Sequence, residues 1–179
     1  MKGIMLAEFL DHAAGRLGPS GVETMVDRCP LGSGGAYSRS GTYPSSEMTE
    51  LVGALSEATG ESHDSILRGF GHRLGATFVE AYPEYFDAAC FFDFVESIDS
   101  HIHVEVMKRY PEAKLPRFRT VWRSEDALII DYISPRRLEG LAHGLLEACA
   151  KPFGEVVHIQ TSIIKTDEAS TVRFRLEKR

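Results

Sequence analysis

The chain has 179 residues, of which 43% are hydrophobic, and a formal net charge of −6 at pH 7. This length suits one ordinary domain with a sizeable core, so we expect a single domain over residues 1–179. The negative charge provides no basic surface that would attract nucleic acid or anionic lipid, so a small ligand or a protein partner is expected instead.

The sequence has no apolar run near the ~20 residues that span a bilayer, and its first residues lack the pattern of a cleaved signal peptide. We therefore expect a cytoplasmic protein with no membrane association. The three cysteines, Cys29, Cys90 and Cys149, are widely spaced and form no Cys-x-x-Cys pair. This spacing is typical of a reducing compartment and argues against structural zinc.

Helical periodicity dominates the first part of the chain. Apolar residues recur at helical spacing, and Gly18-Pro19 supplies a stop after the first such segment. A Gly- and Ser-rich loop is expected at residues 31–35. The predicted helices cover residues 2–17, 21–27, 45–60, 62–82 and 86–109.

The last part of the chain has strand-like character. Residues 118–122 and 127–132 predict a hairpin, and 156–165 with 171–176 predict a second strand pair around a turn at 166–170. Between the pairs, Ser134 as N-cap and Pro135 at the first helical position predict a helix to about residue 150. The expected fold class is α+β, with an N-terminal helical part, a small C-terminal antiparallel sheet and one helix on it.

His103 is the first candidate for chemistry. A rotation of about 100° per residue along the predicted helix places His103 on the apolar stripe of Phe92, Val95, Val106 and Met107, so we expect it to face inward. A histidine in that setting can hold a metal through one neutral ring nitrogen, although an ordinary hydrogen-bonded core histidine fits the same pattern. His101 is about 200° away around the helix, so we interpret it as a surface residue that cannot share an ion with His103.

The segment Tyr132-Ile133-Ser134-Pro135-Arg136 places three hydrogen-bond donors at alternate positions. Two hydroxyls and a guanidinium suit a pair of carboxylates, and a helix that starts at Pro135 would add free backbone N–H groups. A strand end followed by an N-cap and a solvated arginine explains the same residues.

Other motifs are less informative. Gly69-Phe70-Gly71 lies inside a helical pattern and is explained by close helix packing, not by a phosphate loop. We expect His143 at or near the surface of its helix. No serine or cysteine has the setting of an activated nucleophile, and no paired carboxylates are evident, so an enzyme is not expected.

Several of these segments together resemble the H-NOX family of haem domains, which bind nitric oxide or oxygen. The resemblance rests on the start Met1-Lys2-Gly3-Ile4, the run Asp99-Ser100-His101-Ile102-His103-Val104, Leu115-Pro116-Arg117-Phe118 and Tyr132-x-Ser134-x-Arg136. It covers nearly the whole chain, and it implies that haem is held between the helical part and the sheet.

The resemblance also implies roles for individual residues. His103 matches the proximal iron ligand, Pro116 matches the proline that distorts the porphyrin, and three residues match those that hold the haem propionates: Tyr132, Ser134 and Arg136. Pocket positions are matched by Met5, Phe9, Leu74, Phe78, Leu141 and Leu145.

Because the chain has no Cys-x-x-Cys-His motif, the expected cofactor is non-covalent haem b. Relatives with a C-terminal zinc site carry several cysteines there, and this chain has only Cys149, so no zinc is expected.

Leu141 occupies the position at which oxygen-binding members carry a hydrogen-bonding tyrosine. With Phe9 and Leu74 it leaves no donor for bound oxygen, so the resemblance implies a sensor of nitric oxide and carbon monoxide that excludes oxygen. The expected output is in trans, to a histidine kinase or a cyclic-di-GMP enzyme. A passive carrier of haem or of an apolar ligand remains the alternative.

Overall fold

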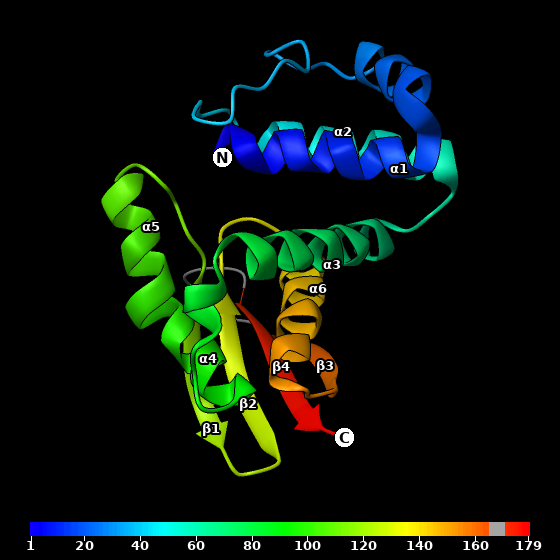
Figure 1. The fold of residues 1–179 in the computed structure, drawn as a ribbon. Coiled ribbons are helices and arrows are strands. Elements are labelled where there is room, and N and C mark those ends of the chain that lie inside the picture. Colours follow the sequence, from blue (N-terminus) through cyan, green and yellow to red (C-terminus); the bar gives the residue numbers. More distant parts are fainter. Residues whose placement is uncertain (165–170) are drawn as a thin grey trace.

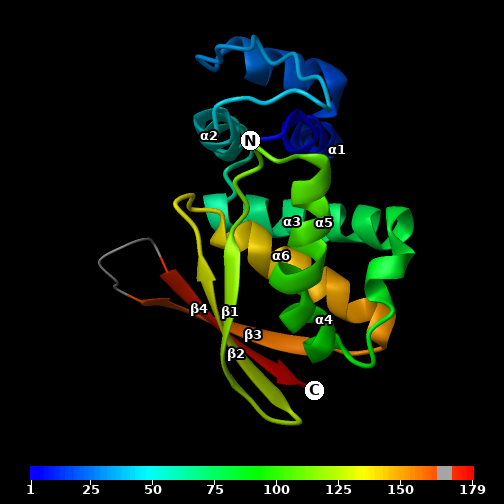
Figure 2. The ribbon, with the colours of Figure 1, turned by 90° about the vertical axis from the view of Figure 1, so that its left-hand side faces the viewer.

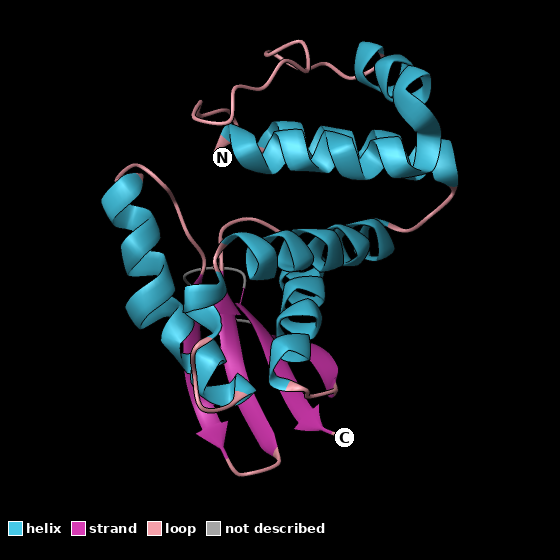
Figure 3. Cartoon of the chain, in the orientation of Figure 1, coloured by secondary structure: helices cyan, strands magenta, loops and turns pink. Residues whose placement is uncertain are grey.

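The computed structural model describes residues 1–164 and 171–179. Figure 1 shows a helical part that contains the N-terminus and a sheet below it, and Figure 3 separates helices from strands by colour. The α+β class predicted from the sequence is confirmed. The described elements are α1 (Gly3–Asp27), α2 (Ser46–Thr59), α3 (His63–Ala81), the 3₁₀ turn η1 (Pro83–Phe86), α4 (Phe91–Ser97), the π-helical turn η2 (Ile98–Ile102), α5 (His103–Arg109), β1 (Arg117–Arg123), β2 (Ala127–Ile133), α6 (Glu139–Ala150), the 3₁₀ turn η3 (Lys151–Phe153), β3 (Val157–Ile164) and β4 (Thr171–Lys178).

The four described strands form one antiparallel sheet in the order β1-β2-β4-β3. A bulge between Thr120 and Trp122 shifts the register of β1 against β2. Figure 2 shows α4 and α6 on the same side of this sheet. The alternation of each strand therefore directs one set of side chains, including Leu128, Ile130 and Phe174, toward these helices, where they are buried.

Two separate clusters of buried side chains form the interior. The first joins α4, α6 and the inner face of the sheet, and it includes Phe91, Phe92 and Phe174. The second joins α1, α2 and α3, and it includes Phe9, Phe70 and also Leu141 of α6. Helices α3 and α6 therefore connect the two clusters.

Glycines allow α3 and α6 to approach closely. A Cβ atom at Gly71 would overlap the backbone of Leu141 and Leu145, and one at Gly144 would overlap the backbone of Arg68. Among the described residues Gly71 thus has the packing role predicted for the Gly69-Phe70-Gly71 segment, whereas Gly69 faces Arg16 and His12 of α1.

The predicted stop at Gly18-Pro19 is a kink. Gly18 adopts a positive φ of 69°, which a residue with a side chain rarely does, and the two predicted helices on either side of it run on as one element, α1. The helices predicted over 45–60 and 62–82 agree with α2 and α3 within two residues at each end.

Two helix predictions need correction. The helix expected over 86–109 begins only at Phe91 and contains the π-helical turn. The helix expected from Pro135 begins at Glu139, because the Ser134 hydroxyl accepts from the Arg136 N–H (3.1 Å) in a local turn that does not continue as a helix. Ser134 is therefore not an N-cap, and Arg136 is not in the first helical turn.

Three other expectations concern His143, the turn at 166–170 and membrane spans. His143 lies near the surface in a half-buried position, with its side chain 13% exposed and its Nδ1 3.5 Å from Thr161 Oγ1 on β3. The predicted turn at 166–170 and residue 165 lie outside the described residues. Among the helices that are described, none is long and apolar enough to cross a membrane.

Candidate functional site

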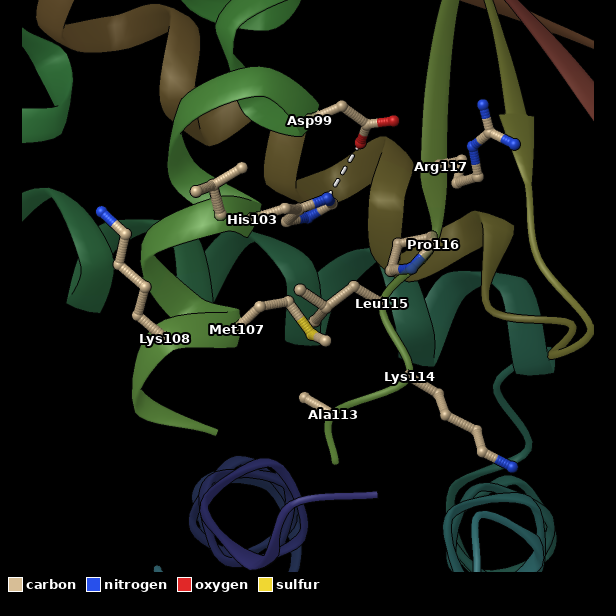
Figure 4. A pocket seen from close by; sticks show the side chains of 10 residues that line it. Asp99, His103, Met107, Lys108, Ala113, Lys114, Leu115, Pro116 and Arg117 are labelled. Carbon is tan, nitrogen blue, oxygen red and sulfur yellow. Dashed lines mark hydrogen bonds and ion pairs between the residues drawn. The ribbon is translucent and has the colours of Figure 1, made fainter. Parts of the chain in front are cut away.

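His103 is held by a carboxylate one turn earlier. Its Nδ1 lies 2.9 Å from Asp99 Oδ1, and the other Asp99 oxygen accepts from the backbone N–H of Phe118 on β1 (2.9 Å). Figure 4 shows the Asp99–His103 contact at the top of a pocket. One carboxylate thus connects the histidine both to the π-helical turn and to the sheet.

This contact determines which His103 nitrogen is free. A carboxylate only accepts, so Nδ1 carries the proton and the lone pair is on Nε2, to which no described residue donates or accepts a hydrogen bond. Burial lowers the pKa of His103 although Asp99 acts to raise it. The ring is therefore neutral at pH 7, the form that ligates metals.

The π-helical turn sets the direction in which His103 points. It interrupts the 100° stepping that aligned His103 with Phe92 and Val95, which are buried in the core against the sheet. His103 instead lines a cavity with Met107, which is 39% exposed. The expectation that His103 points inward holds, but toward a cavity and not toward the stripe of Phe92 and Val95.

The cavity has a volume of about 650 Å³. Its walls come from η2, α5 and the segment before β1, and Figure 4 shows His103, Met107, Leu115 and Pro116 turned toward one another. Two apolar lining residues, Val104 and Met107, are 43% and 39% exposed. This size and this apolar surface suit a large, largely hydrophobic ligand. The lining residues are Asp99, His103, Val104, Met107, Lys108, Ala113, Lys114, Leu115, Pro116 and Arg117.

Tyr132 and Ser134 are buried close to His103. They are 4% and 2% exposed, and the Phe118 ring bridges His103 and Tyr132 with centroid distances of 6.1 and 5.4 Å. Burial raises the pKa of Tyr132 against the opposing effects of Ser134 and Arg136. Tyr132 is therefore a protonated donor at neutral pH.

Arg136 lies beside the cavity. Its guanidinium donates to the carbonyl oxygen of Lys114, which is a cavity residue. Burial lowers the pKa of the Met1 amino group, and the positive charges of Arg136, Lys2 and Lys114 lower it further. Of these cations, Arg136 also acts on Tyr132 and follows Ser134 in a local turn, so its guanidinium is the group best placed to meet an anion there.

The other six predicted pocket residues lie in the core formed by α1, α2 and α3. Phe9, Leu74 and Leu141 are buried in it, whereas Met5, Phe78 and Leu145 are partly buried against it. None of the six lines the cavity below His103. The structure thus brings them together with one another, and it brings His103 together with Pro116.

Comparison with known proteins identifies the fold. A family model described as Haem-NO-binding matches residues 2–161. The chain belongs to this family, the H-NOX family. Its members are haem-based gas sensors.

Solved structures and a curated relative support the same family assignment. Two structures of the Fe(II) unliganded H-NOX protein from K. algicida, the unmodified protein and its A71G mutant, are 32% and 33% identical. Each superposes with a TM-score of 0.94 over 100% of this chain and 97% of the other. "Soluble guanylate cyclase 89Db" of Drosophila melanogaster is 34% identical over 101 residues, which are 52% of this chain and 14% of that protein. The matched region is thus a small part of the cyclase.

The residues present fit haem. His103 offers an unpartnered Nε2 to a cavity of suitable size, the cavity walls expose Val104 and Met107, and donors for carboxylates lie beside it. No group of three or more His, Cys, Asp or Glu in 1–164 and 171–179 is arranged to hold a metal ion.

The sequence interpretation of this H-NOX chain did not assign a role to Asp99. A signal was present, because an acidic residue four positions before a histidine on a helix can reach its ring. Lys114 was missed as well, and no motif marked it, because its position depends on the path of the chain between α5 and β1.

Proposed function

We propose that this H-NOX chain is a sensor of nitric oxide that carries haem b, also binds carbon monoxide and excludes oxygen. The observation that carries the proposal is the geometry of His103, whose Nε2 faces an apolar cavity while Asp99 fixes Nδ1. Bound haem would supply an iron atom that takes up a diatomic gas. No catalytic group is part of the proposal.

Specific residues would hold the cofactor. His103 would ligate the iron, and Pro116, on the opposite wall of the same cavity, would press on the porphyrin. Tyr132, Ser134 and Arg136 would bind the propionates, with Arg136 exchanging the Lys114 carbonyl for a carboxylate. We also propose that residues 1–179 act as one domain and that no zinc is bound.

Gas selectivity would follow from side chains that lack donors. Phe9, Leu74 and Leu141 are buried in the apolar core of α1, α2 and α3, and Met5, Phe78 and Leu145 pack against it. Because none of them lines the cavity at His103, the gas would bind on the side of the haem that faces this core. Bound oxygen gains more from a hydrogen-bond donor in an apolar pocket than nitric oxide or carbon monoxide does. Selection against oxygen is the consequence.

Transmission would use the connections of His103. Asp99 links it to the Phe118 N–H on β1, so a displaced His103 pulls on an edge strand of the sheet. At the other end of α5, Glu112 pairs with Lys2 (2.8 Å), which joins this region to the N-terminal helices. A change at His103 is thus communicated to both parts of the fold. The receiver would be a separate cytoplasmic protein, a histidine kinase or a cyclic-di-GMP enzyme.

An absorption series tests the proposal. The haem-loaded ferrous protein is recorded without ligand, with nitric oxide, with carbon monoxide and in air. We expect shifted Soret bands with nitric oxide and carbon monoxide, and no oxygenated spectrum. A stable oxygenated spectrum would contradict the selectivity, and the lack of any Soret band after haem loading would contradict the function.

A second experiment separates a sensor from a passive carrier. His103→Gly with added imidazole keeps an iron ligand but severs its covalent link to α5. A sensor should then load haem and bind nitric oxide without changing the activity of its effector. An effector response that persists without the covalent link would contradict the proposed switch through His103.

A further inference from the structure

The face of the sheet that points away from α4 and α6 is here called the outer face. Its members are defined by the strand register, because paired residues project to the same side. No described helix covers it, as Figure 2 shows. The outer face comprises Arg117, Arg119 and Trp122 of β1, Ala127, Ile129, Asp131 and Ile133 of β2, Thr171, Arg173, Arg175 and Glu177 of β4, and His158, Gln160, Ser162 and Ile164 of β3.

The chain's single tryptophan lies on this face. Trp122 is opposite Ile129 in the register and is 49% exposed. The bulge between Thr120 and Trp122 changes which residues of β1 face outward, and it places this indole on the outer face. Contact of so large an apolar side chain with water is unfavourable, so its burial by a partner would contribute favourably to binding.

The outer face is positive although the chain is negative. Four arginines lie on it with only two carboxylates, Asp131 and Glu177. Asp131 is 1% exposed and accepts from both Arg119 (2.8 Å) and Arg173 (2.8 and 3.1 Å). This buried carboxylate fixes the two guanidiniums in place, and because it serves both of them, a net positive charge remains.

A hollow of about 300 Å³ lies between the arginines and β3. Its walls are formed by Ile129, Gln160, Thr161, Ser162, Arg173 and Arg175. It combines an apolar side chain with an amide, hydroxyls and two guanidiniums. These groups match a side-chain carboxylate next to an apolar group.

We propose that the outer face docks an acidic segment of the effector protein, with an apolar side chain of that segment against Trp122 and Ile129. The proposal rests on the proposed function, because it supplies the contact through which a sensor acts in trans. Charge complementarity selects an acidic occupant, and tryptophan and arginine are the residue types that contribute most binding energy in interfaces. Trp122, Arg117, Arg119 and Arg175 are exposed on this face. Arg175 Nε donates to Glu177 (2.7 Å) and Arg119 donates to Asp131, so Trp122 and Arg175 test the apolar and the charged part of the contact.

Peptide binding provides the test. The haem-loaded ferrous chain is titrated into fluorescein-labelled synthetic peptides of equal length, in which Leu alternates with Glu, Gln or Lys, and anisotropy is recorded. We expect the Glu peptide to bind at least about tenfold more tightly than the Gln and Lys peptides, with an advantage that falls as salt is raised. Equal binding of the three peptides would overturn the proposal.

Variants locate the contact. Trp122→Ala and Arg175→Glu should each weaken the Glu peptide about tenfold. The matched controls, Val156→Ala at an apolar residue that is 64% exposed and Arg28→Glu at an exposed arginine beyond α1, should leave affinity unchanged. Equal losses in variants and controls would show non-specific attraction and overturn the proposal.

Two further measurements keep the outcomes distinct. All variants should retain the Soret band and the nitric oxide spectrum of the parent, because Trp122 and Arg175 lie outside the cavity. A parent chain that fails to prefer the Glu peptide but keeps its spectra contradicts the docking proposal and leaves the proposed function intact. A chain that prefers the Glu peptide but shows no haem spectra contradicts the proposed function and leaves the docking face intact. Sedimentation that shows a dimer of this chain, abolished by Trp122→Ala, would make a second copy the occupant and would contradict an acidic effector segment.

Discussion

Asp99 and His103 form a pair in which the carboxylate fixes the orientation of the imidazole ring, while the π-helical turn sets the direction of the side chain. The distance between Oδ1 and Nδ1 is 2.9 Å, and the second carboxylate oxygen is bound by Phe118 N–H at the same distance. Because both oxygens are occupied, the carboxylate has little freedom to rotate. The free Nε2 of His103 is therefore held toward the cavity.

Asp99→Asn should weaken haem binding. The amide nitrogen cannot accept a hydrogen bond, so the variant loses either the His103 contact or the Phe118 contact. Changes to groups that orient a ligand lower metal affinity by about 10–100-fold. The rate of haem transfer to an excess of a haem-scavenging protein measures this. His101→Gln, at an exposed neighbour, is the control, and equal rates for both variants would contradict the assigned role of Asp99.

Leu141→Tyr should permit oxygen binding. Leu141 is buried in α6 among apolar side chains, so a phenol at this position would introduce a donor that is shielded from water. The ferrous variant in air should show an oxygenated spectrum that the parent lacks. Leu141→Phe supplies the same ring without the hydroxyl. If the phenylalanine variant also holds oxygen, the effect is due to shape, and the selectivity argument fails.

Gly71→Ala should destabilise the fold. The new methyl group would overlap the backbone of Leu141 and Leu145 on α6, and neither chain segment can yield without separating the helices. Overpacking of this kind costs about 1–3 kcal/mol. Gly53→Ala is the control, because no atom lies within 4 Å of its new methyl group and alanine favours helix by about 0.5–1 kcal/mol. Urea denaturation of both variants measures the change in the free energy of unfolding. An unchanged value for Gly71→Ala would contradict the close packing of α3 and α6.

Lys2→Met should loosen the end of α5. Lys2 donates to Ser40 O, Thr42 Oγ1 and Glu112 Oε1, and its ammonium lies 4.8 Å from the Tyr110 ring centroid. The loss in global stability should be small, because Glu112 is exposed and solvent screens its ion pair. Hydrogen exchange should nevertheless become faster over residues 103–112 and remain unchanged in α2. Unchanged exchange at both places would show that Lys2 does not restrain α5.

His12 should make the fold sensitive to acid. Burial, together with the charges of Arg16 and Arg73, lowers its pKa to about 4, against a weaker opposing effect of Glu61. In the unfolded chain the pKa is near 6.5, so below pH 6.5 the unfolded state binds a proton that the folded state does not. This contribution to stability is complete above pH 6.5 and is lost as the pH falls to about 4.

His12→Gln removes this titration. Between pH 7 and pH 4 the variant should lose less unfolding free energy than the parent by about 1–3 kcal/mol. His103 and His143, whose pKa values are also lowered by burial, titrate in both proteins and cancel in the difference. Parallel stability curves for parent and variant would contradict a neutral, buried His12.

The sequence alone predicts the features of the fold that local residue patterns determine. The periodicity of α2 and α3 and the β-type runs on either side of the turn at 123–126 predict their elements, because burial of one face dictates the residue types. Gly71 was assigned correctly for the same reason. The residue pattern at Tyr132, Ser134 and Arg136 identified donors that the fold does bring beside the cavity.

Other features depended on tertiary contacts. Helical stepping assumes 3.6 residues per turn, so it could not reveal the π-helical turn before His103. The delayed start of α6 reflects competition between a helix at Pro135 and the contact of Ser134 with Arg136, which local propensity does not resolve. The grouping of Met5, Phe9 and Leu74 away from the cavity follows from how α1 packs on α3.

The π-helical turn also limits how this segment can change in length. An α-helical turn closes its hydrogen bonds with one residue fewer, so a single-residue deletion within Ile98–Ile102 would restore regular geometry and rotate His103 by about 100° about the helix axis. The imidazole would then no longer point into the cavity. Point substitutions on the exposed side of the turn are compatible with the site, whereas insertions and deletions there should be eliminated in any lineage that retains the cofactor.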